Sequence, residues 1–124
     1  MGNMMLTVNQ LTFDQEVLGS ATPVLVNFWA PWCGVCRMID PLLLELQKDW
    51  DGQIKLVSIN ADDNLKLSNT YKLKTLPTVL LFNKQQVLCR IDRFHNRSDF
   101  REASAMLQVA LSEVLPHRSY SASV

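Results

Sequence analysis

The chain has 124 residues, of which 48% are apolar and 8% aromatic, and its 12 basic side chains balance its 12 acidic ones. This length and composition predict one domain with a hydrophobic core of its own and exclude a disordered chain. The net charge of zero gives no reason to expect a nucleic acid or an anionic membrane surface as partner. No apolar run approaches the roughly 20 residues that a membrane-spanning helix requires.

Cysteine usage indicates a reducing environment. The three cysteines, Cys33, Cys36 and Cys89, are too few and too odd in number for a disulfide framework. The first residues show neither the basic start nor the small-residue cleavage site of a secretory signal peptide, so we expect none. We therefore expect a cytoplasmic protein in which any disulfide is transient.

The first predicted elements are short. Residues 4–8 are apolar enough to form a first strand. The segment 12–18 is predicted to be a helix that begins with a capping box, in which Thr12 is the N-cap and Gln15 is the third helical residue. Gly19 follows this helix, and glycine suits the left-handed residue that often ends a helix.

The middle of the chain carries the clearest signals. Residues 24–29 form a near-continuous apolar run, typical of a strand buried on both faces, and only Asn27 interrupts it. Apolar residues then recur at spacings of three and four over residues 33–50, which predicts an amphipathic helix. Pro41 lies inside this helix, and its missing N–H is expected to kink the helix there.

The second half of the chain predicts two more helices and three more strands. Alternation over residues 54–60 predicts a strand, and the turn-forming residues 62–64 lead into a short helix that ends near residue 70. Apolar runs at residues 79–82 and 87–91 flank a polar connection and predict a hairpin, although the connection lacks glycine. The apolar spacing over residues 98–115 predicts the last helix.

Taken together, the elements follow the order β-α-β-α-β-α-β-β-α. This order predicts an α/β fold with a mixed central β-sheet flanked by helices on both faces. Residues 1–116 are expected to form the one domain, and the small, polar residues 117–124 are expected to form a disordered tail. We expect the protein to be a monomer.

Two cysteines stand where the strand of residues 24–29 gives way to the helix of residues 33–50. A thiolate on Cys33 would lie against the unpaired N–H groups of the first helical turn, where the helix dipole favours negative charge. Cys36 lies one turn further on, close enough to form a disulfide with Cys33. Attack by one thiol, a mixed disulfide and release by the second thiol is the chemistry that this arrangement allows.

A zinc site is the alternative use of these side chains. Cys33, Cys36, Cys89 and His95 are four ligands of types that zinc accepts. Their spacing supplies only one close pair, however, and Cys89 is expected on a distant hairpin strand. We therefore favour redox chemistry with neither a metal nor a cofactor, and we expect Cys89 to be a thiol without a role.

The chain resembles the thioredoxin family in the stretch VNFWAPWCGVCRMI at residues 26–39, in Pro41, and in the stretch TLPT at residues 75–78. The resemblance runs colinearly from about residue 4 to residue 115 and implies the thioredoxin fold. It also implies that Cys33 is the attacking nucleophile and Cys36 the buried resolving thiol. A cis peptide bond before Pro77, facing the cysteine pair, is a further implication.

By the same resemblance, residues around the cysteines would receive and position an extended segment of the substrate. The candidates are Trp32, Gly34, Val35, Leu76, Pro77 and Arg93. Trp29 also flanks the pair, although a purely structural role is the alternative for this side chain.

Two departures from the family's pattern concern the chemistry. Val35 stands where thioredoxins usually have proline, so it restores a backbone N–H near Cys33 and predicts a less reducing potential. Asn27 stands where they have a buried aspartate that accepts the proton of the resolving cysteine. An amide cannot do this, so mixed disulfides should live longer. The simpler interpretation, compatible with this one, is that Asn27 satisfies a buried hydrogen bond.

Two further departures concern charge. Ser58 stands where the family often has a lysine near that aspartate, so both members of the charge pair are neutral here. The loss of both charges together is physically reasonable, because a single buried charge without its partner is costly. Arg93 replaces a glycine beside the substrate groove, where it would exclude the usual substrates or select acidic ones. A solvated surface arginine is the alternative.

The first functional hypothesis is a thioredoxin-like protein thiol–disulfide oxidoreductase that uses the Cys33/Cys36 pair. Its substrates would be proteins with disulfides, and its electrons would come from an external reductase of the thioredoxin reductase type or from a small dithiol. An altered redox potential and a reduced general reductase activity are expected. The second hypothesis is a redox-responsive binding or regulatory module with little catalytic turnover.

Overall fold

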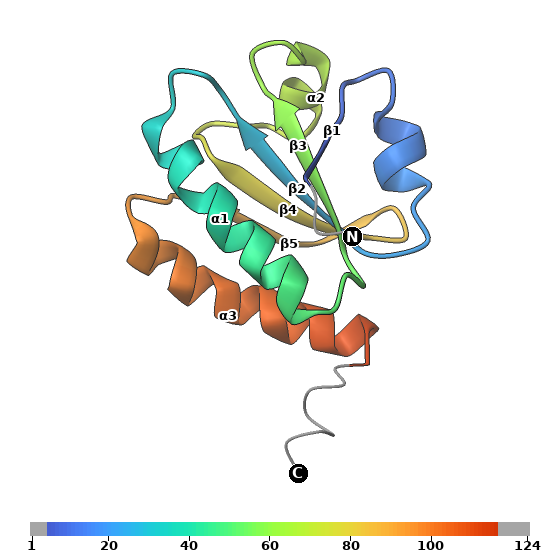
Figure 1. The fold of residues 1–124 in the computed structure, drawn as a ribbon. Coiled ribbons are helices and arrows are strands. Elements are labelled where there is room, and N and C mark those ends of the chain that lie inside the picture. Colours follow the sequence, from blue (N-terminus) through green and yellow to red (C-terminus); the bar gives the residue numbers. More distant parts are fainter. Residues whose placement is uncertain (1–4, 117–124) are drawn as a thin grey trace.

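A five-stranded sheet forms the centre of the computed structural model, which describes residues 5–116 (Figure 1). The strands are β1 (Met5–Thr7), β2 (Val24–Trp29), β3 (Lys55–Asn60), β4 (Thr78–Asn83) and β5 (Gln86–Asp92). The helices are α1 (Gly34–Asp49), α2 (Leu65–Thr70), α3 (Arg97–Val114) and one turn of π-helix, η1 (Asp14–Leu18). Every element expected from the sequence is therefore present within two residues of its predicted bounds. The predicted strand residue Met4 and the predicted tail, residues 117–124, lie outside the described residues.

The sheet is mixed and has the strand order β1-β3-β2-β4-β5. β1 and β2 run parallel to β3, whereas β4 runs antiparallel to both of its neighbours, β2 and β5. β2 is therefore the central strand, and its register places Asn27 opposite Ser58 on β3 and opposite Val79 on β4. The mixed α/β architecture predicted from the order of the elements is confirmed.

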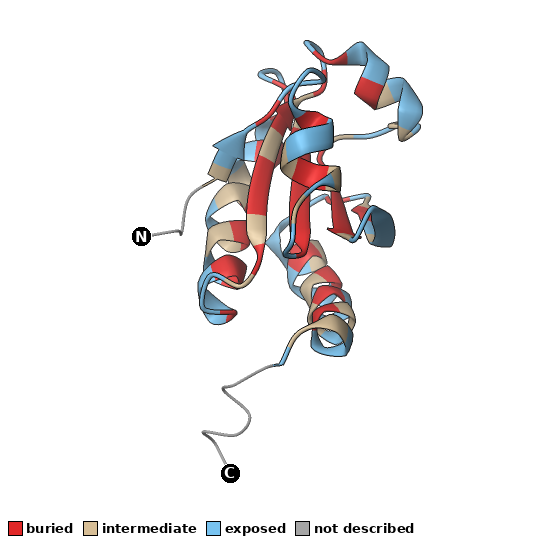
Figure 2. Ribbon diagram, turned by 90° about the vertical axis from the view of Figure 1, so that its right-hand side faces the viewer, coloured by how far each residue is buried: buried red, intermediate tan, exposed pale blue. Residues whose placement is uncertain are grey.

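Helices cover both faces of the sheet, as the sequence predicted. In Figure 1, α1 and α3 lie together on one face, where Leu43 and Leu107 pack with Leu25 of the central strand. The opposite face is covered by η1 and α2, and its core includes Val26 from β2 and Leu67 from α2. Figure 2 shows that the buried residues are concentrated in the strands and on the helix sides that face them. β2 is buried on both faces, which explains its near-continuous apolar sequence.

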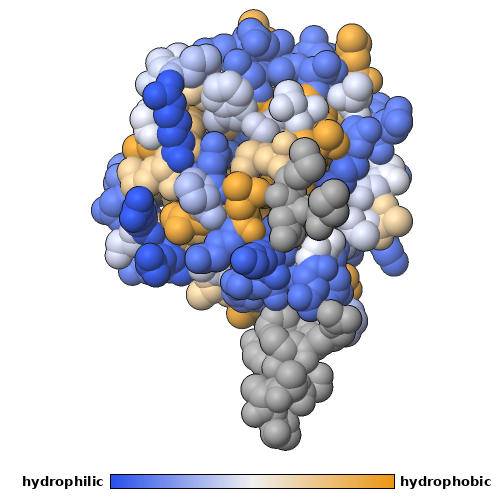
Figure 3. Space-filling view, viewed as in Figure 1, coloured by the Kyte–Doolittle hydropathy of each residue, from blue (hydrophilic) through white to orange (hydrophobic). Residues whose placement is uncertain are grey.

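Several large hydrophobic side chains are exposed on the described surface. On the face seen in Figure 3, hydrophobic residues stand in small groups separated by hydrophilic ones. The most exposed large hydrophobic side chains are Leu11, Trp32 and Leu65. Within residues 5–116, no helix combines the length and the apolar composition needed to cross a membrane.

The predicted capping box at Thr12 is wrong, because the reciprocal pattern lies three residues earlier. The side-chain oxygen of Asn9 accepts a hydrogen bond from the backbone N–H of Thr12 (3.1 Å), while the Thr12 hydroxyl accepts one from the backbone N–H of Asn9 (3.2 Å). Thr12 is thus the last residue of a turn that precedes η1, and no side chain caps η1 itself. Both residue types favour such caps, so the sequence offered two competing starts.

Gly19 ends η1 for a reason other than the one predicted. Its φ is −88°, which is not left-handed. A Cβ at this position would instead lie 3.0 Å from the backbone oxygen of Gln15. Close approach of the backbone is therefore the physical reason for glycine at this position.

The β4–β5 hairpin is confirmed, and its turn shows how the chain manages without glycine. Lys84 and Gln85 both have positive φ, 50° and 75°. Two residues with positive φ are the requirement of the hairpin turn whose twist matches that of the strands. Side chains with a Cβ are strained in this conformation.

α1 runs from Gly34 to Asp49 through Pro41, and the kink expected there stays a prediction.

Candidate active site

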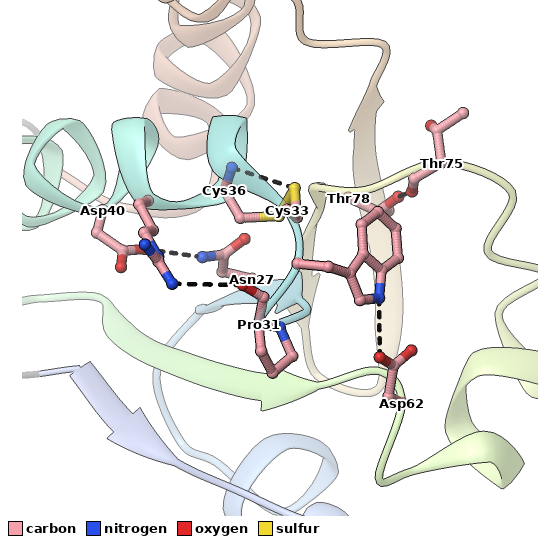
Figure 4. The surroundings of a disulfide bond; sticks show 10 residues. Asn27, Pro31, Cys33, Cys36, Asp40, Asp62, Thr75 and Thr78 are labelled. Carbon is pink, nitrogen blue, oxygen red and sulfur yellow. Dashed lines mark hydrogen bonds between the residues drawn. A yellow bond between two sulfur atoms is a disulfide. The ribbon is translucent and has the colours of Figure 1, made fainter.

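The two cysteines lie where the chain leaves the central strand, β2, and enters α1. Cys33 is the N-cap residue of α1, with an extended backbone conformation, and Cys36 lies in its first turn. The two residues form a disulfide, with their Cα atoms 5.4 Å apart (Figure 4). The sulfur of Cys33 accepts a hydrogen bond from the backbone N–H of Cys36 at 3.2 Å. Cys33 therefore occupies the position where a helix most favours an anionic side chain.

This geometry suits the two thiols to different parts of a redox cycle. The Cys33 sulfur that becomes a thiolate on reduction lies at the helix start, against N–H groups that have no partner inside the helix. Cys36 is more deeply buried, at 2% exposure against 6% for Cys33. In the oxidised protein the hydrogen bond to the Cys33 sulfur comes from Cys36. Among the described residues, the N–H of Val35 makes no such bond, so an effect of Val35 on the thiolate stays a prediction.

The loop before β4 packs against the cysteines. The peptide bond between Leu76 and Pro77 is cis, as the resemblance implied. Leu76 packs against the small buried cluster that contains both cysteines, and so do Trp29 and Val35. The hydroxyl of Thr78 donates to the carbonyl oxygen of Thr75 at 2.7 Å, which fixes the turn around the proline.

Trp32 projects from the loop between β2 and α1. Its side chain is 70% exposed, and its indole N–H donates to a carboxylate oxygen of Asp62 at 2.9 Å (Figure 4). Sequence reasoning missed Asp62, because the contact joins residues 30 positions apart. The bond holds a large exposed aromatic ring in one orientation beside the disulfide.

A hollow of about 220 Å³ lies next to this tryptophan. Its lining is formed by the loop between β3 and α2, by α2, and by the segment before Pro77. The lining residues used below are Trp32, Asp62, Leu65, Leu73 and Leu76. The hollow therefore joins an exposed indole, apolar side chains, one carboxylate and the side chain of Lys74, a combination that suits a peptide segment.

Arg93 belongs to a different hollow. It lines a depression of about 320 Å³ between β5 and α3, together with Glu102 and Met106. The structure therefore does not bring Arg93 into the cavity that Trp32 and Leu76 line. Its backbone φ is 86°, on the left-handed side where a glycine is favoured. The predicted effect of Arg93 on substrate choice stays a prediction.

Asn27 lies beneath the disulfide and is fully buried. Its side-chain N–H donates to a carboxylate oxygen of Asp40 at 3.1 Å (Figure 4). Its own oxygen has no hydrogen-bond partner among the described residues. An unsatisfied buried acceptor costs about 1–3 kcal/mol. The bond predicted for Asn27 is thus half present, with Asp40 as partner, and Ser58 is its neighbour on β3.

Asp40 is the second polar residue of this site that sequence reasoning missed, after Asp62. It is partly buried in α1, and this burial raises the pKa of its carboxyl group above the ordinary value. Asp40 follows Cys36 by four residues, and this spacing places two side chains next to each other on one helix face. That spacing was the signal in the sequence that could have identified it.

Cys89 is remote from the pair in the fold. It lies on β5, half-buried against the core that α1 and α3 form, and burial raises the pKa of its thiol. A thiol of raised pKa is a poorer nucleophile at neutral pH. Among residues 5–116, no three side chains of His, Cys, Asp or Glu are grouped as metal ligands.

Comparison with known proteins agrees with this geometry. The family model described as Thioredoxin matches residues 4–106. Thioredoxin 1 of Nostoc sp. is 46% identical over 79 residues, which cover 64% of this chain and 74% of that protein. The M-type chloroplastic thioredoxin of Pisum sativum is 48% identical over 80 residues, and the match covers 64% of this chain and 46% of that protein. The thioredoxin of Synechocystis sp. is 40% identical over 79 residues.

The residues matched by the family model span most of the described fold, including the cysteine pair and the cis-proline loop. A Cys-x-x-Cys disulfide at a helix start supports thiol–disulfide oxidoreductase chemistry. The chain belongs to the thioredoxin family.

Proposed function

We propose that this protein is a thioredoxin-type disulfide reductase whose release step is slower, and whose potential is less reducing, than in a typical thioredoxin. The observation that carries the proposal is Asn27, a fully buried amide beneath the disulfide. An amide cannot take a proton and return it as a carboxylate does.

The proposed cycle begins with Cys33. Its thiolate attacks one sulfur of a substrate disulfide, a Cys33–substrate bond forms, and the other substrate sulfur leaves as a thiolate that takes a proton from water. Trp32 and the loop before Pro77 hold the substrate segment while this occurs. The support for this role is the hollow beside Trp32, which joins Leu76 to exposed apolar side chains.

The second half of the cycle depends on Cys36. Its thiol loses a proton, and its sulfur attacks the sulfur of Cys33. The Cys33–Cys36 bond forms, the Cys33–substrate bond breaks, and the electron pair leaves with the substrate sulfur. The substrate is thereby reduced and the pair oxidised. Without a carboxylate at position 27, the loss of the Cys36 proton becomes harder, so the mixed disulfide lives longer.

The partners in this proposal are proteins with accessible disulfides and an external reductase of the thioredoxin reductase type. We expect a reducing compartment, with the cytoplasm as the first candidate. The name of the Pisum sativum relative contains the word chloroplastic, so a plastid-type compartment is the second candidate. A monomer is sufficient for the proposed cycle, because both cysteines come from one chain.

A redox-responsive binding module is the second candidate function. It is favoured by the same buried amide, since a long-lived mixed disulfide holds a partner rather than releasing it. The strained Arg93, where the family has glycine, adds a second difference from a general reductase.

Insulin reduction driven by dithiothreitol tests the proposal. The wild type, Asn27→Asp and the inactive control Cys33→Ser are compared. We expect slow reduction by the wild type, faster reduction by Asn27→Asp and none by the control. Fast reduction by the wild type, unchanged in Asn27→Asp, would show that position 27 does not limit release. If both proteins are inactive, the binding module becomes the better description.

The redox potential is tested separately by equilibration with glutathione. A less reducing pair is expected to be more reduced than a typical thioredoxin at the same glutathione ratio. The variant Val35→Pro, which removes the restored N–H, is expected to shift the equilibrium toward the more reducing side. An unchanged equilibrium would remove Val35 as the cause.

A further inference from the structure

The face of α1 that lies above Asn27 carries an acidic side chain, Asp40, that could serve the chemistry of Cys36. Cys36 and Asp40 are four residues apart on the same helix. Residues at this spacing are neighbours on one helix face, with their Cβ atoms about 5–6 Å apart. Helical side chains lean toward the N-terminus of their helix, so the Asp40 side chain leans toward the turn that holds Cys36. Direct contact, or contact through one water molecule, is therefore within reach of the carboxylate.

Asn27 holds this carboxylate in place. The amide N–H donates to Asp40 at 3.1 Å, across the gap between β2 and α1. In Figure 4 the nitrogen of Asn27 is turned toward Asp40, and its oxygen is turned toward the cysteine pair. This oxygen is buried and has no partner among the described residues while the disulfide is closed. Reduction creates a thiol on Cys36, and a thiol or a bridging water is the kind of donor that this oxygen lacks.

Few other charges face this pair. On α1, Arg37 precedes Asp40 by three residues, but its guanidinium donates to the carbonyl oxygen of Pro31 at 3.3 Å. The neighbouring strands place Ser58 and Val79 opposite Asn27, and neither side chain ionises. Asp40 makes no ion pair within residues 5–116. Its carboxylate therefore remains available to take up a proton.

We propose that Asp40 is the proton acceptor for Cys36 in the release step, in place of the carboxylate that position 27 lacks, and that Asn27 positions it. The proton of the Cys36 thiol passes to Asp40, directly or through one water. The Cys36 sulfur then attacks Cys33, the Cys33–substrate bond breaks, and the substrate thiolate takes a proton back from Asp40 or from water. This inference rests on the proposed function, in which Cys36 is the resolving thiol.

The test separates attack from release with one reagent, dithiobis(nitrobenzoate), in a stopped-flow instrument. Each half of the reagent that is released absorbs light, so the reduced protein gives two phases. The first phase reports attack by Cys33, and the second reports release by Cys36. All proteins carry Cys89→Ser, so that this thiol does not contribute. The variant Cys36→Ser identifies the second phase by removing it.

Asp40→Asn is the decisive variant, because asparagine keeps an oxygen that can accept the hydrogen bond from Asn27. We expect it to slow the second phase about a hundredfold, the lower end of the range for loss of a general base, and to leave the first phase unchanged. Asp40→Ala should slow the second phase to the same extent. The matched control is Asp49→Asn, an exposed aspartate at the far end of the same helix, which should change neither phase.

Three results would contradict the role of Asp40 as proton acceptor. An unchanged second phase in Asp40→Asn would overturn it. If only Asp40→Ala slows this phase, Asp40 acts as a structural partner of Asn27 and accepts no proton. In a background with Asn27→Asp, the restored buried carboxylate should take over, so adding Asp40→Asn should then have little effect. A large effect of Asp40→Asn in that background would contradict the idea that either carboxylate can accept the Cys36 proton.

A missing first phase would refute the proposed function, because Cys33 would then not attack the reagent. A second measurement, which needs no turnover, still tests the role of Asp40 in that case. In the reduced Cys33→Ser protein, absorbance of the thiolate gives the pH at which the Cys36 thiol ionises. A carboxylate beside this thiol disfavours the thiolate. Asp40→Asn should therefore lower that pH, and Asp49→Asn should not. No difference between the two variants would overturn the inference.

Discussion

Arg93 provides the sharpest test of the backbone geometry described above. Its φ of 86° is unfavourable for a residue with a Cβ, at a cost of about 1–2 kcal/mol. Glycine removes this cost, but it loses about 0.5–1 kcal/mol more conformational entropy on folding. The difference predicts that Arg93→Gly raises the free energy of unfolding by about 0.5–1 kcal/mol. For a chain of 124 residues, this corresponds to a melting temperature higher by about 2–5 °C.

The assay is thermal and urea unfolding of the oxidised protein, with Arg93→Ala as the matched control. Alanine removes the charge and the long side chain but keeps the Cβ, so it should give no gain in stability. Equal stabilisation by alanine and glycine would show that the side chain, and not the backbone, is unfavourable. A lower melting temperature of Arg93→Gly would refute the strain argument.

In the insulin assay, faster reduction by both variants would assign substrate exclusion to the arginine side chain.

Three further predictions concern stability. Replacing Lys84 by Asn and Gln85 by Gly supplies the residues that the hairpin turn prefers, and it should raise the urea midpoint by an amount equivalent to about 1 kcal/mol. An unchanged midpoint would contradict the strain inferred from their positive φ. Leu107→Ala, in a fully buried position of α3, should lower the free energy of unfolding by about 2–5 kcal/mol, and a much smaller loss would show that α3 packs loosely. Asp40 has a raised pKa in the folded protein, so wild-type stability falls as pH rises from the ordinary aspartate value through the raised one. The stability gain of Asp40→Asn over the wild type should therefore grow with pH across this window and stay constant above it, and a pH-independent difference would contradict the raised pKa.

The strands and the main helices could be predicted because their residues follow from burial. β2 is apolar along nearly its whole length, since helices cover both of its faces. The apolar spacing of α1 follows in the same way from packing against one face of the sheet. The cysteine pair could be placed at a helix start because the pattern changes from strand to helix at this point. These features depend on local sequence and on one nearby surface.

The start and end of η1 could not be predicted, because several residues compete for the same local bonds. Asn9 and Thr12 are both good capping residues, and only the three-dimensional structure shows that they cap each other. Gly19 had two possible physical reasons, positive φ and close approach. The sequence does not distinguish them, and the second is the actual one.

The polar contacts of the site depend on tertiary structure. Asn27 and Asp40 are 13 residues apart, and Trp32 and Asp62 are 30 apart, so each bond joins separate elements. Asp40 had one local signal, its spacing of four from Cys36. That spacing gains meaning only once Asn27 is known to lie beneath the same helix face.

The position of Asp40 also bears on how fast release can be. The partly buried Asp40 loses less hydration than a carboxylate fully buried in the central strand would, so its pKa is raised less. A carboxylate of lower pKa is the weaker base and holds an accepted proton less firmly. Release assisted by Asp40 should therefore be slower than release assisted by a buried carboxylate at position 27, and faster than release to water alone. The proposed slow but functional release step would therefore depend on both residues, the amide of Asn27 and the carboxylate of Asp40 to which it donates.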